Sequence, residues 1–104
     1  MKLYTTGDVA NEEIETSLGL VRGNTIRARN LGRDILAGLR NLVGGEIKDY
    51  TEMLSGAREE AITRMIDEAE ELDADGIVEV RFSTSQTMGG AAEILAYGTA
   101  VRFK

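Results

Sequence analysis

The stretch Glu46–Ala74, EIKDYTEMLSGAREEAITRMIDEAEELDA, decides the fold because it carries the strongest periodic signal in the chain. Its apolar residues recur every three or four positions, which is the spacing of one face of an α-helix. The main stripe consists of Ile47, Tyr50, Leu54, Ala57, Ala61 and Met65, and it is widened by Met53, Ile62, Ile66, Ala69 and Leu72. The run Asp73 to Gly76 (DADG) then ends the pattern with a glycine suited to a turn. We therefore predict one long amphipathic helix over residues 46–74.

A glycine pair, Gly44 and Gly45, stands directly before this helix. A phosphate-binding loop also places glycines before a helix, but it follows them with lysine and then serine or threonine. Here the helix begins with Glu46, whose carboxylate would repel a phosphate at the positive end of the helix dipole. We therefore expect a structural joint, in which Gly44 ends a short helix over residues 30–43 and a new helix starts.

Three segments are predicted as strands: residues 14–23 (IETSLGLVRG), 77–84 (IVEVRFST) and 91–103 (AAEILAYGTAVRF). The long crossover between the first two favours a parallel orientation. A Gly-Gly pair before the last strand is typical of a hairpin turn, so the last strand can lie between the others, antiparallel to both. The predicted fold is α+β, a β-α-β-β two-layer domain. It has a three-stranded, mainly antiparallel sheet (order 1-3-2), a short helix and one long helix.

The apolar positions of the last two strands indicate which sheet faces are covered. In the strand over residues 77–84, Val78, Val80 and Phe82 are expected to face the core. The last strand is apolar on both faces. One face carries Leu95, Tyr97, Thr99, Val101 and Phe103, and the other carries Ile94, Ala96, Gly98 and Ala100. Such a strand is usually central or covered by a second molecule. Because one helix layer covers one face, the other is expected to be an interaction surface.

Length and composition restrict the class of protein. The 104 residues fit one domain, taken as residues 1–104. The chain has no cysteine and no histidine, which removes thiol chemistry, the commonest general base and the commonest transition-metal ligand. A net charge of −6 disfavours binding to nucleic acid, and no apolar run is long enough to span a membrane. Without a signal-peptide pattern at the N-terminus, we expect a cytoplasmic protein with no cofactor.

Acidic residues are concentrated in residues 46–75, which hold 11 acidic and 3 basic side chains. The run Glu71–Gly76 resembles the first half of a calcium-binding loop, but Phe82 stands where the bidentate glutamate is required. Adjacent acid pairs along the helix are typical of a solvated face rather than of a converging catalytic pair. Such carboxylates suit a hard divalent cation only weakly, so no metal ligand is assigned.

Arginines form a second candidate site, for an anion or a small ligand. Arg33 and Arg40 share one face if their segment is helical, and Arg58 belongs to the long helix together with Tyr50. Tyr50 can place its hydroxyl in a pocket or be an ordinary core residue. We take Arg33, Arg40, Tyr50 and Arg58 as the candidate ligand-binding residues. The alternative is ion pairing between the arginines and the acidic helix, within a subunit or between subunits.

Several short motifs occur in a fixed order: Arg33-Asp34, Ala37 to Arg40 (AGLR), Val43 to Gly45 (VGG), Leu72 to Val78 (LDADGIV) and Tyr97 to Val101 (YGTAV). By their order and spacing the chain resembles the YbjQ-like family over essentially its whole length. That family is uncharacterised and carries the label of a heavy-metal-binding domain. The resemblance implies a dodecin-subunit-like α/β fold and a ring-shaped homopentamer, in which subunit sheets pack around an axis. It implies no reaction.

From these observations we expect a non-enzymatic homo-oligomer, a ring of five copies, that binds an unidentified small ligand at subunit interfaces. An enzyme would have to work with Asp, Glu, Tyr, Thr or Lys alone. The alternative function is metal-ion binding, as the family label suggests. Heavy metals prefer thiolate or imidazole ligands, which this chain lacks, so hard cations on carboxylates are the favoured metals. The expected partner is the protein itself, with no nucleic acid and no membrane.

Overall fold

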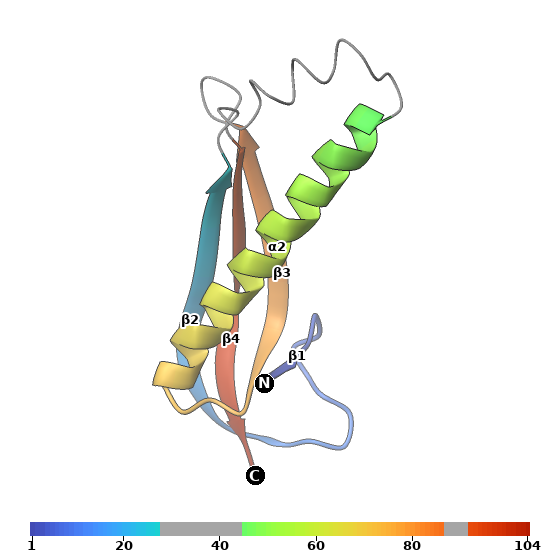
Figure 1. Ribbon diagram of the computed structural model, residues 1–104. Coiled ribbons are helices and arrows are strands. Elements are labelled where there is room, and N and C mark those ends of the chain that lie inside the picture. Colours follow the sequence, from blue (N-terminus) through green and yellow to red (C-terminus); the bar gives the residue numbers. More distant parts are fainter. Residues whose placement is uncertain (28–44, 87–91) are drawn as a thin grey trace.

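One helix and four strands make up the part of the chain that the computed structural model describes, residues 1–27, 45–86 and 92–104 (Figure 1). The elements are β1 (Lys2–Leu3), β2 (Ile14–Arg27), α2 (Gly45–Glu71), β3 (Gly76–Gln86) and β4 (Ala92–Phe103). The long helix thus begins at Gly45, the second residue of the predicted joint. Gly44, the predicted short helix over residues 30–43 and the Gly-Gly turn before β4 lie outside the described residues. No described helix is long and apolar enough to cross a membrane.

The strands are ordered β1-β3-β4-β2 in one mixed sheet. β4 lies between β2 and β3 and is antiparallel to both, as predicted for the three long strands. The prediction of only three strands is wrong, because β1 pairs in parallel with the start of β3. Tyr4 continues this pairing: its N–H donates to the Ile77 carbonyl and its carbonyl accepts from the Val80 N–H, each at 2.9 Å. At two residues, β1 is too short to show the alternation that marks a strand in a sequence.

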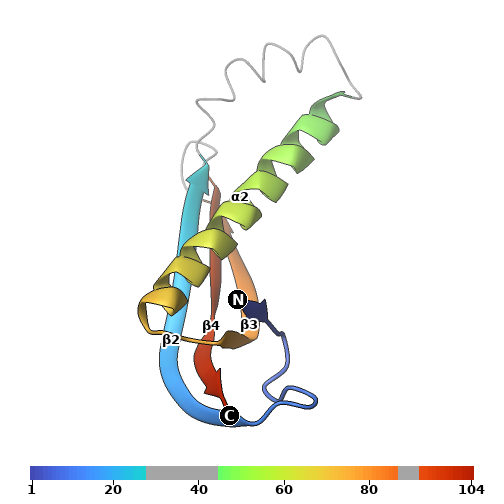
Figure 2. The same ribbon diagram turned by 60° about the horizontal axis from the view of Figure 1, so that its bottom comes forward.

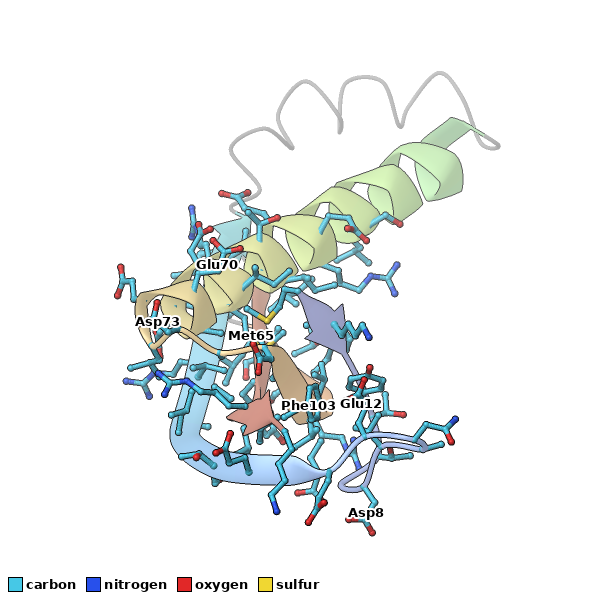
Figure 3. All side chains as sticks on the ribbon, turned by 90° about the horizontal axis from the view of Figure 1, so that it is seen from below. Asp8, Glu12, Met65, Glu70, Asp73 and Phe103 are labelled. Atoms are coloured by element: carbon cyan, nitrogen blue, oxygen red, sulfur yellow. The ribbon has the colours of Figure 1, made fainter. Side chains whose placement is uncertain are left out.

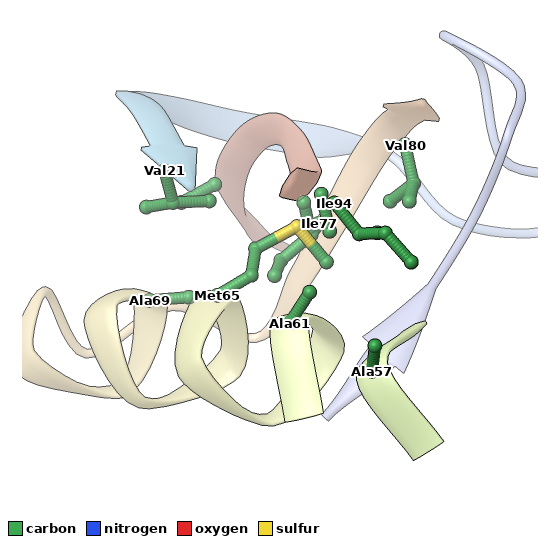
Figure 4. Packing of buried hydrophobic residues seen from close by; sticks show 10 residues of the cluster. Val21, Ala57, Ala61, Met65, Ala69, Ile77, Val80 and Ile94 are labelled. Atoms are coloured by element: carbon green, nitrogen blue, oxygen red, sulfur yellow. The ribbon is translucent and has the colours of Figure 1, made fainter. Parts of the chain in front are cut away.

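α2 covers one face of the sheet and packs mainly against β2 and β4 (Figures 1 and 2). Its predicted apolar stripe is confirmed, since Ala57, Ala61, Met65 and Ala69 are fully buried. Their side chains point from the helix toward the strands, with Met65 reaching deepest into the layer between them (Figure 4). Three alanines let the helix approach closely, and β2 presents Gly23 beneath it. A Cβ added there would overlap the Ala61 carbonyl oxygen and the Met65 amide nitrogen, so this packing needs glycine.

The end of α2 is held by the end of β4. The helix stops three residues before its predicted end, and the turn after it supplies carbonyl groups to Arg102. The Arg102 side chain donates from Nε to the Asp73 carbonyl at 3.0 Å and from Nη2 to the Leu72 carbonyl at 3.2 Å. A cation at this end complements the helix dipole. The Asp75 carboxylate accepts from the Phe103 N–H at 3.0 Å. The run that resembles half a calcium loop is therefore a helix-ending turn.

A bulge in β3 changes which side chains face the core. The register with β4 shifts between Val78 and Arg81, and Glu79 has a left-handed φ of 53°. Because of this extra residue, Val78 points to the opposite sheet face from Val80 and Phe82. Strict alternation had placed all three side chains on one face. Phe82 is 47% exposed, so the prediction that it faces the core is wrong. The physical reason is that α2 lies over β2 and β4 and leaves this half of β3 uncovered.

Candidate functional site

The sheet face opposite α2 is the candidate functional surface. Ile94, Ala96 and Ala100 of β4 are buried in one cluster with the apolar residues of the helix. Because side chains alternate along a strand, the odd-numbered residues of β4 point to the other face. Directly paired residues of β2 and β4 point to the same face. Leu20 pairs with Thr99, so Leu20 also lies on the open face. The prediction that β4 is apolar on both faces is thus confirmed, and its position is central.

Large apolar side chains are exposed on this open face. Leu20 is 63% exposed, Ile26 is 59% exposed and Tyr97 is 36% exposed. Single exposed apolar residues are ordinary on protein surfaces, but several on one sheet face mark an interaction surface. In the described residues these side chains form an apolar strip that crosses from β2 to β4 and is interrupted on β2 by Arg22 and Asn24, which lie on the same face.

A cleft of about 590 Å³ opens on the same face, at the end of the sheet where both β2 and β3 are irregular. This volume is within the range of small-ligand sites. The cleft is lined by Gly7, Asp8, Ile14, Ser17, Val78, Glu79, Thr99 and Val101. It combines three aliphatic side chains with two hydroxyl groups and two carboxylates.

The N-terminal segment brings Asp8 to this cleft. The Thr6 carbonyl accepts a hydrogen bond from the Glu79 N–H at 3.0 Å, and the Thr6 hydroxyl donates to the Asp8 carbonyl at 2.6 Å. The Glu79 carboxylate lies against Gly7, where an added Cβ would be 3.0 Å from Oε1. Figure 3 shows Asp8 in the N-terminal loop, on the opposite side of the molecule from Glu70 of α2. A left-handed φ at Glu79 is strained for any residue other than glycine, and strain of this kind often accompanies a functional site.

Asp8 and Glu79 form no ion pair with any other described residue. Two free carboxylates beside the hydroxyls of Ser17 and Thr99 suit a cationic group, which can receive charge-assisted hydrogen bonds from them. No set of three or more Asp, Glu, His or Cys side chains gathers into a metal-binding cluster within the described ranges. Sequence reasoning missed this cleft, because its two acids are far apart in the chain and meet only through the pairing of the N-terminal segment with β3.

Among the four residues predicted to bind a ligand, the structure describes the side chain of Arg58 only. Arg33 and Arg40 lie outside the described residues, and Tyr50 lies in α2 with a side chain outside the described part. Arg58 is exposed, and its Nη2 donates to the Ser55 hydroxyl at 3.2 Å. It therefore lies on the helix surface, on the other side of the sheet from the cleft. The predicted arginine site stays a prediction.

The fold and open surface of the described residues define a class: an α+β domain with one helix layer and one sheet face that no described helix covers. The profile of the YbjQ family, described as "Putative heavy-metal-binding", matches residues 1–104. The chain is 63% identical over 102 residues to a UPF0145 protein of Archaeoglobus fulgidus, covering 98% of this chain and 94% of that relative. It is 60% identical over 104 residues to a UPF0145 protein of Halorubrum lacusprofundi, with both chains covered completely. The chain therefore belongs to the YbjQ family, and the predicted resemblance is confirmed.

The same fold occurs in a crystal structure from Pediococcus pentosaceus, of a protein with unknown function in the DUF74 family. Its TM-score with this chain is 0.68 at 19% sequence identity, and the match covers 100% of this chain and 98% of the other. At this identity the likeness concerns the fold alone. It agrees with the arrangement of one helix on a mixed four-stranded sheet.

Proposed function

We propose that this protein is a non-enzymatic homo-oligomer, a ring of five copies in the cytoplasm, that binds a small ligand at subunit interfaces. The observation that carries the proposal is the apolar strip on the open sheet face, formed by Leu20, Ile26 and Tyr97. Burial of apolar surface stabilises an association by about 25 cal/mol per Å². A second copy would remove this surface from water. The number five and the ring come from the family resemblance.

The dimensions of the chain support association. Its radius of gyration is 17.1 Å, whereas a compact domain of this length has a value of about 13 Å. A chain that is this extended leaves more surface in contact with water than a compact one. The packed layer of helix and strands is also built largely from small side chains, so the core of a single copy is modest. Small domains often compensate for a modest core by forming oligomers.

Light scattering of the purified protein tests the assembly. We expect a mass of five chains at micromolar concentration. Leu20→Lys, which places a charge in the apolar strip, should shift the mass toward single chains. Thr63→Lys adds the same charge at an exposed position of α2 and should leave the mass unchanged. A wild-type protein that is monomeric would contradict the proposal.

The cleft beside the apolar strip supports the ligand part of the proposal. It has two carboxylates, Asp8 and Glu79, so a ligand with a cationic group fits its charge. In thermal-shift measurements, small amines should raise the melting temperature of the wild type. They should not raise that of the double variant Asp8→Asn with Glu79→Gln. Equal shifts in the wild type and the double variant would place the ligand elsewhere.

A second candidate function is the binding of a hard cation, which the same two carboxylates favour. Calcium and magnesium prefer oxygen ligands, whereas heavy metals prefer thiolate and imidazole, which this chain lacks. Calorimetry should therefore detect weak binding of calcium or magnesium, and the double variant at Asp8 and Glu79 should abolish it. Glu70→Gln, on α2, serves as the control. Micromolar affinity for zinc or copper would contradict the argument from ligand chemistry.

A further inference from the structure

The sheet has two unlike free edges among the described residues. One is β2, which pairs with β4 and with no second described strand. The other is the second half of β3, because β1 and the residues after it cover β3 only as far as Val80. Figure 1 shows these two edges on opposite sides of β4. A free edge presents unpaired N–H and C=O groups and is a template for another strand.

The register places the two free edges at the same level of the sheet. Leu95 of β4 pairs with Asn24 on one side and with Ser83 on the other. This correspondence continues in step through residues 22–27 of β2 and 81–86 of β3. Both strands are antiparallel to β4, so they run in the same direction. Within one chain the two segments cannot meet, because β4 lies between them.

We propose that residues 81–86 of one copy pair in parallel with residues 22–27 of a second copy, so that neighbouring sheets join edge to edge. This inference rests on the proposed homo-oligomer and adds an edge contact to it, separate from any cover of the apolar strip on the open face. Because the two edges differ, the contact is head-to-tail, and head-to-tail contacts close into rings when the rotation between copies permits closure. A rotation about an axis roughly along the strands keeps each strand at the same level of the sheet and in the same direction. The two free edges already match in level and in strand direction.

Side chains at both edges favour a second copy as the occupant. Ile26 is 59% exposed at the β2 edge and Phe82 is 47% exposed at the β3 edge. A neighbouring strand lies about 4.8 Å away in a sheet, so pairing would cover part of each side chain. One acceptor of the β2 strand is already used: the Asn24 carbonyl accepts from Arg64 Nη1 at 2.6 Å. A carbonyl oxygen has two lone pairs, so this bond is compatible with a strand.

Engineered cysteines test the pairing directly, because the chain has no cysteine of its own. Asn24 and Ser83 pair with the same residue of β4 and are both exposed. Within one chain they are two strand spacings apart, about 9.6 Å, which is too far for a disulfide. Across the proposed interface they are one spacing apart, about 4.8 Å, which is within disulfide range. Under mild oxidation Asn24→Cys with Ser83→Cys should form a ladder of covalent oligomers that reductant removes.

Mixing the two single-cysteine variants supplies the matched control. Asn24→Cys mixed with Ser83→Cys should give cross-linked pairs and no longer ladder, and each variant alone should give none. The strands of two joined sheets can be offset along their length, so the partner of Ser83 can lie two residues before or after Asn24. Ser83→Cys is therefore also combined with Arg22→Cys and with Ile26→Cys, which lie on the same sheet face as Asn24. Circular dichroism confirms that each variant is folded.

Each outcome separates the two proposals. Cross-linking in any of the three pairs, together with an oligomeric wild type, supports the edge pairing. An oligomeric wild type that gives no cross-link in any pair overturns the edge pairing and leaves the oligomer standing. A cross-link in Ser83→Cys alone indicates symmetric contact between β3 edges and also overturns it. A monomeric wild type overturns both proposals.

Discussion

Gly23→Ala tests the closest contact in the fold, where α2 lies directly on β2. The atoms that obstruct an added methyl group belong to the helix backbone, at Ala61 and Met65, so no side-chain rotation relieves the overlap. The helix must therefore lift from the sheet. A gap of up to about 1 Å forfeits a quarter to a half of each dispersion contact along the fully buried stripe. Overpacking typically costs about 1–3 kcal/mol, and backbone displacement places this site at the upper end.

We therefore expect Gly23→Ala to lower the free energy of unfolding by about 3 kcal/mol, a large share of the roughly 5–15 kcal/mol of an ordinary domain. The melting temperature should fall by about 12–24 °C, at roughly 4–8 °C for each kcal/mol in a domain of this size. Denaturant unfolding followed by circular dichroism measures the effect. All variants are compared at one protein concentration, because association changes apparent stability.

Gly56→Ala makes the same chemical change where the structure leaves room. Gly56 is an exposed residue inside α2, and an added Cβ would meet nothing within 4 Å. Alanine is favoured over glycine in a helix by about 0.5–1 kcal/mol, so this variant should be more stable than the wild type. The two substitutions should therefore change the free energy of unfolding in opposite directions. A Gly23→Ala variant that loses less than about 0.5 kcal/mol would refute the close approach of helix and strand.

Three further substitutions test single contacts by the same unfolding measurement. Thr25 is 3% exposed and its hydroxyl has no partner among the described residues, so Thr25→Val should stabilise the protein by about 1 kcal/mol; a loss would reveal a hidden hydrogen bond. Arg102→Ala removes both bonds to the carbonyls of Leu72 and Asp73 and should cost about 1–2 kcal/mol, whereas an unchanged stability would mean that water replaces the guanidinium. Glu79→Gly relieves a left-handed φ and should stabilise the fold by about 1 kcal/mol; destabilisation would show that the Glu79 side chain holds the N-terminal loop.

The sequence predicted those parts of the fold that depend on repeated side-chain spacing. The buried stripe of α2 recurs at every fourth residue from Ala57 to Ala69, and a pattern of this length identifies a helix. The central place of β4 followed from its two apolar faces. In contrast, β1 is two residues long, and the bulge at Glu79 is a backbone feature of a single residue. Neither leaves a periodic signal, so the sheet gained a strand and Val78 turned to the face opposite Val80. Phe82 is exposed for a different reason, because α2 covers β2 and β4 and leaves this part of β3 open.

The candidate site was less predictable than the fold, because its residues are joined by topology rather than by spacing. Helical periodicity placed Arg33 and Arg40 on one face, and Arg58 of the long helix was added to them as a candidate. Arg58 is the one of the three whose side chain is described, and it lies on the helix surface. Asp8 and Glu79 share no motif, and they become neighbours only because the N-terminal segment runs beside β3. A parallel contact between distant segments is set by hydrogen bonds of the backbone, which every residue can make. Sequence patterns therefore cannot identify it.

The small residues of α2 connect the fold to the proposed assembly. Because Ala57, Ala61 and Ala69 are small and Gly23 lies beneath them, the helix lies close to β2 and β4 rather than spreading over the whole sheet. Close packing on two strands leaves Phe82 of the third strand, β3, exposed. A wider helix with larger side chains would cover more of that face but would lose the direct contact with β2. The same small side chains that bring the helix close to β2 thus leave an apolar side chain of β3 exposed, beside the edge at which we propose that a second copy pairs.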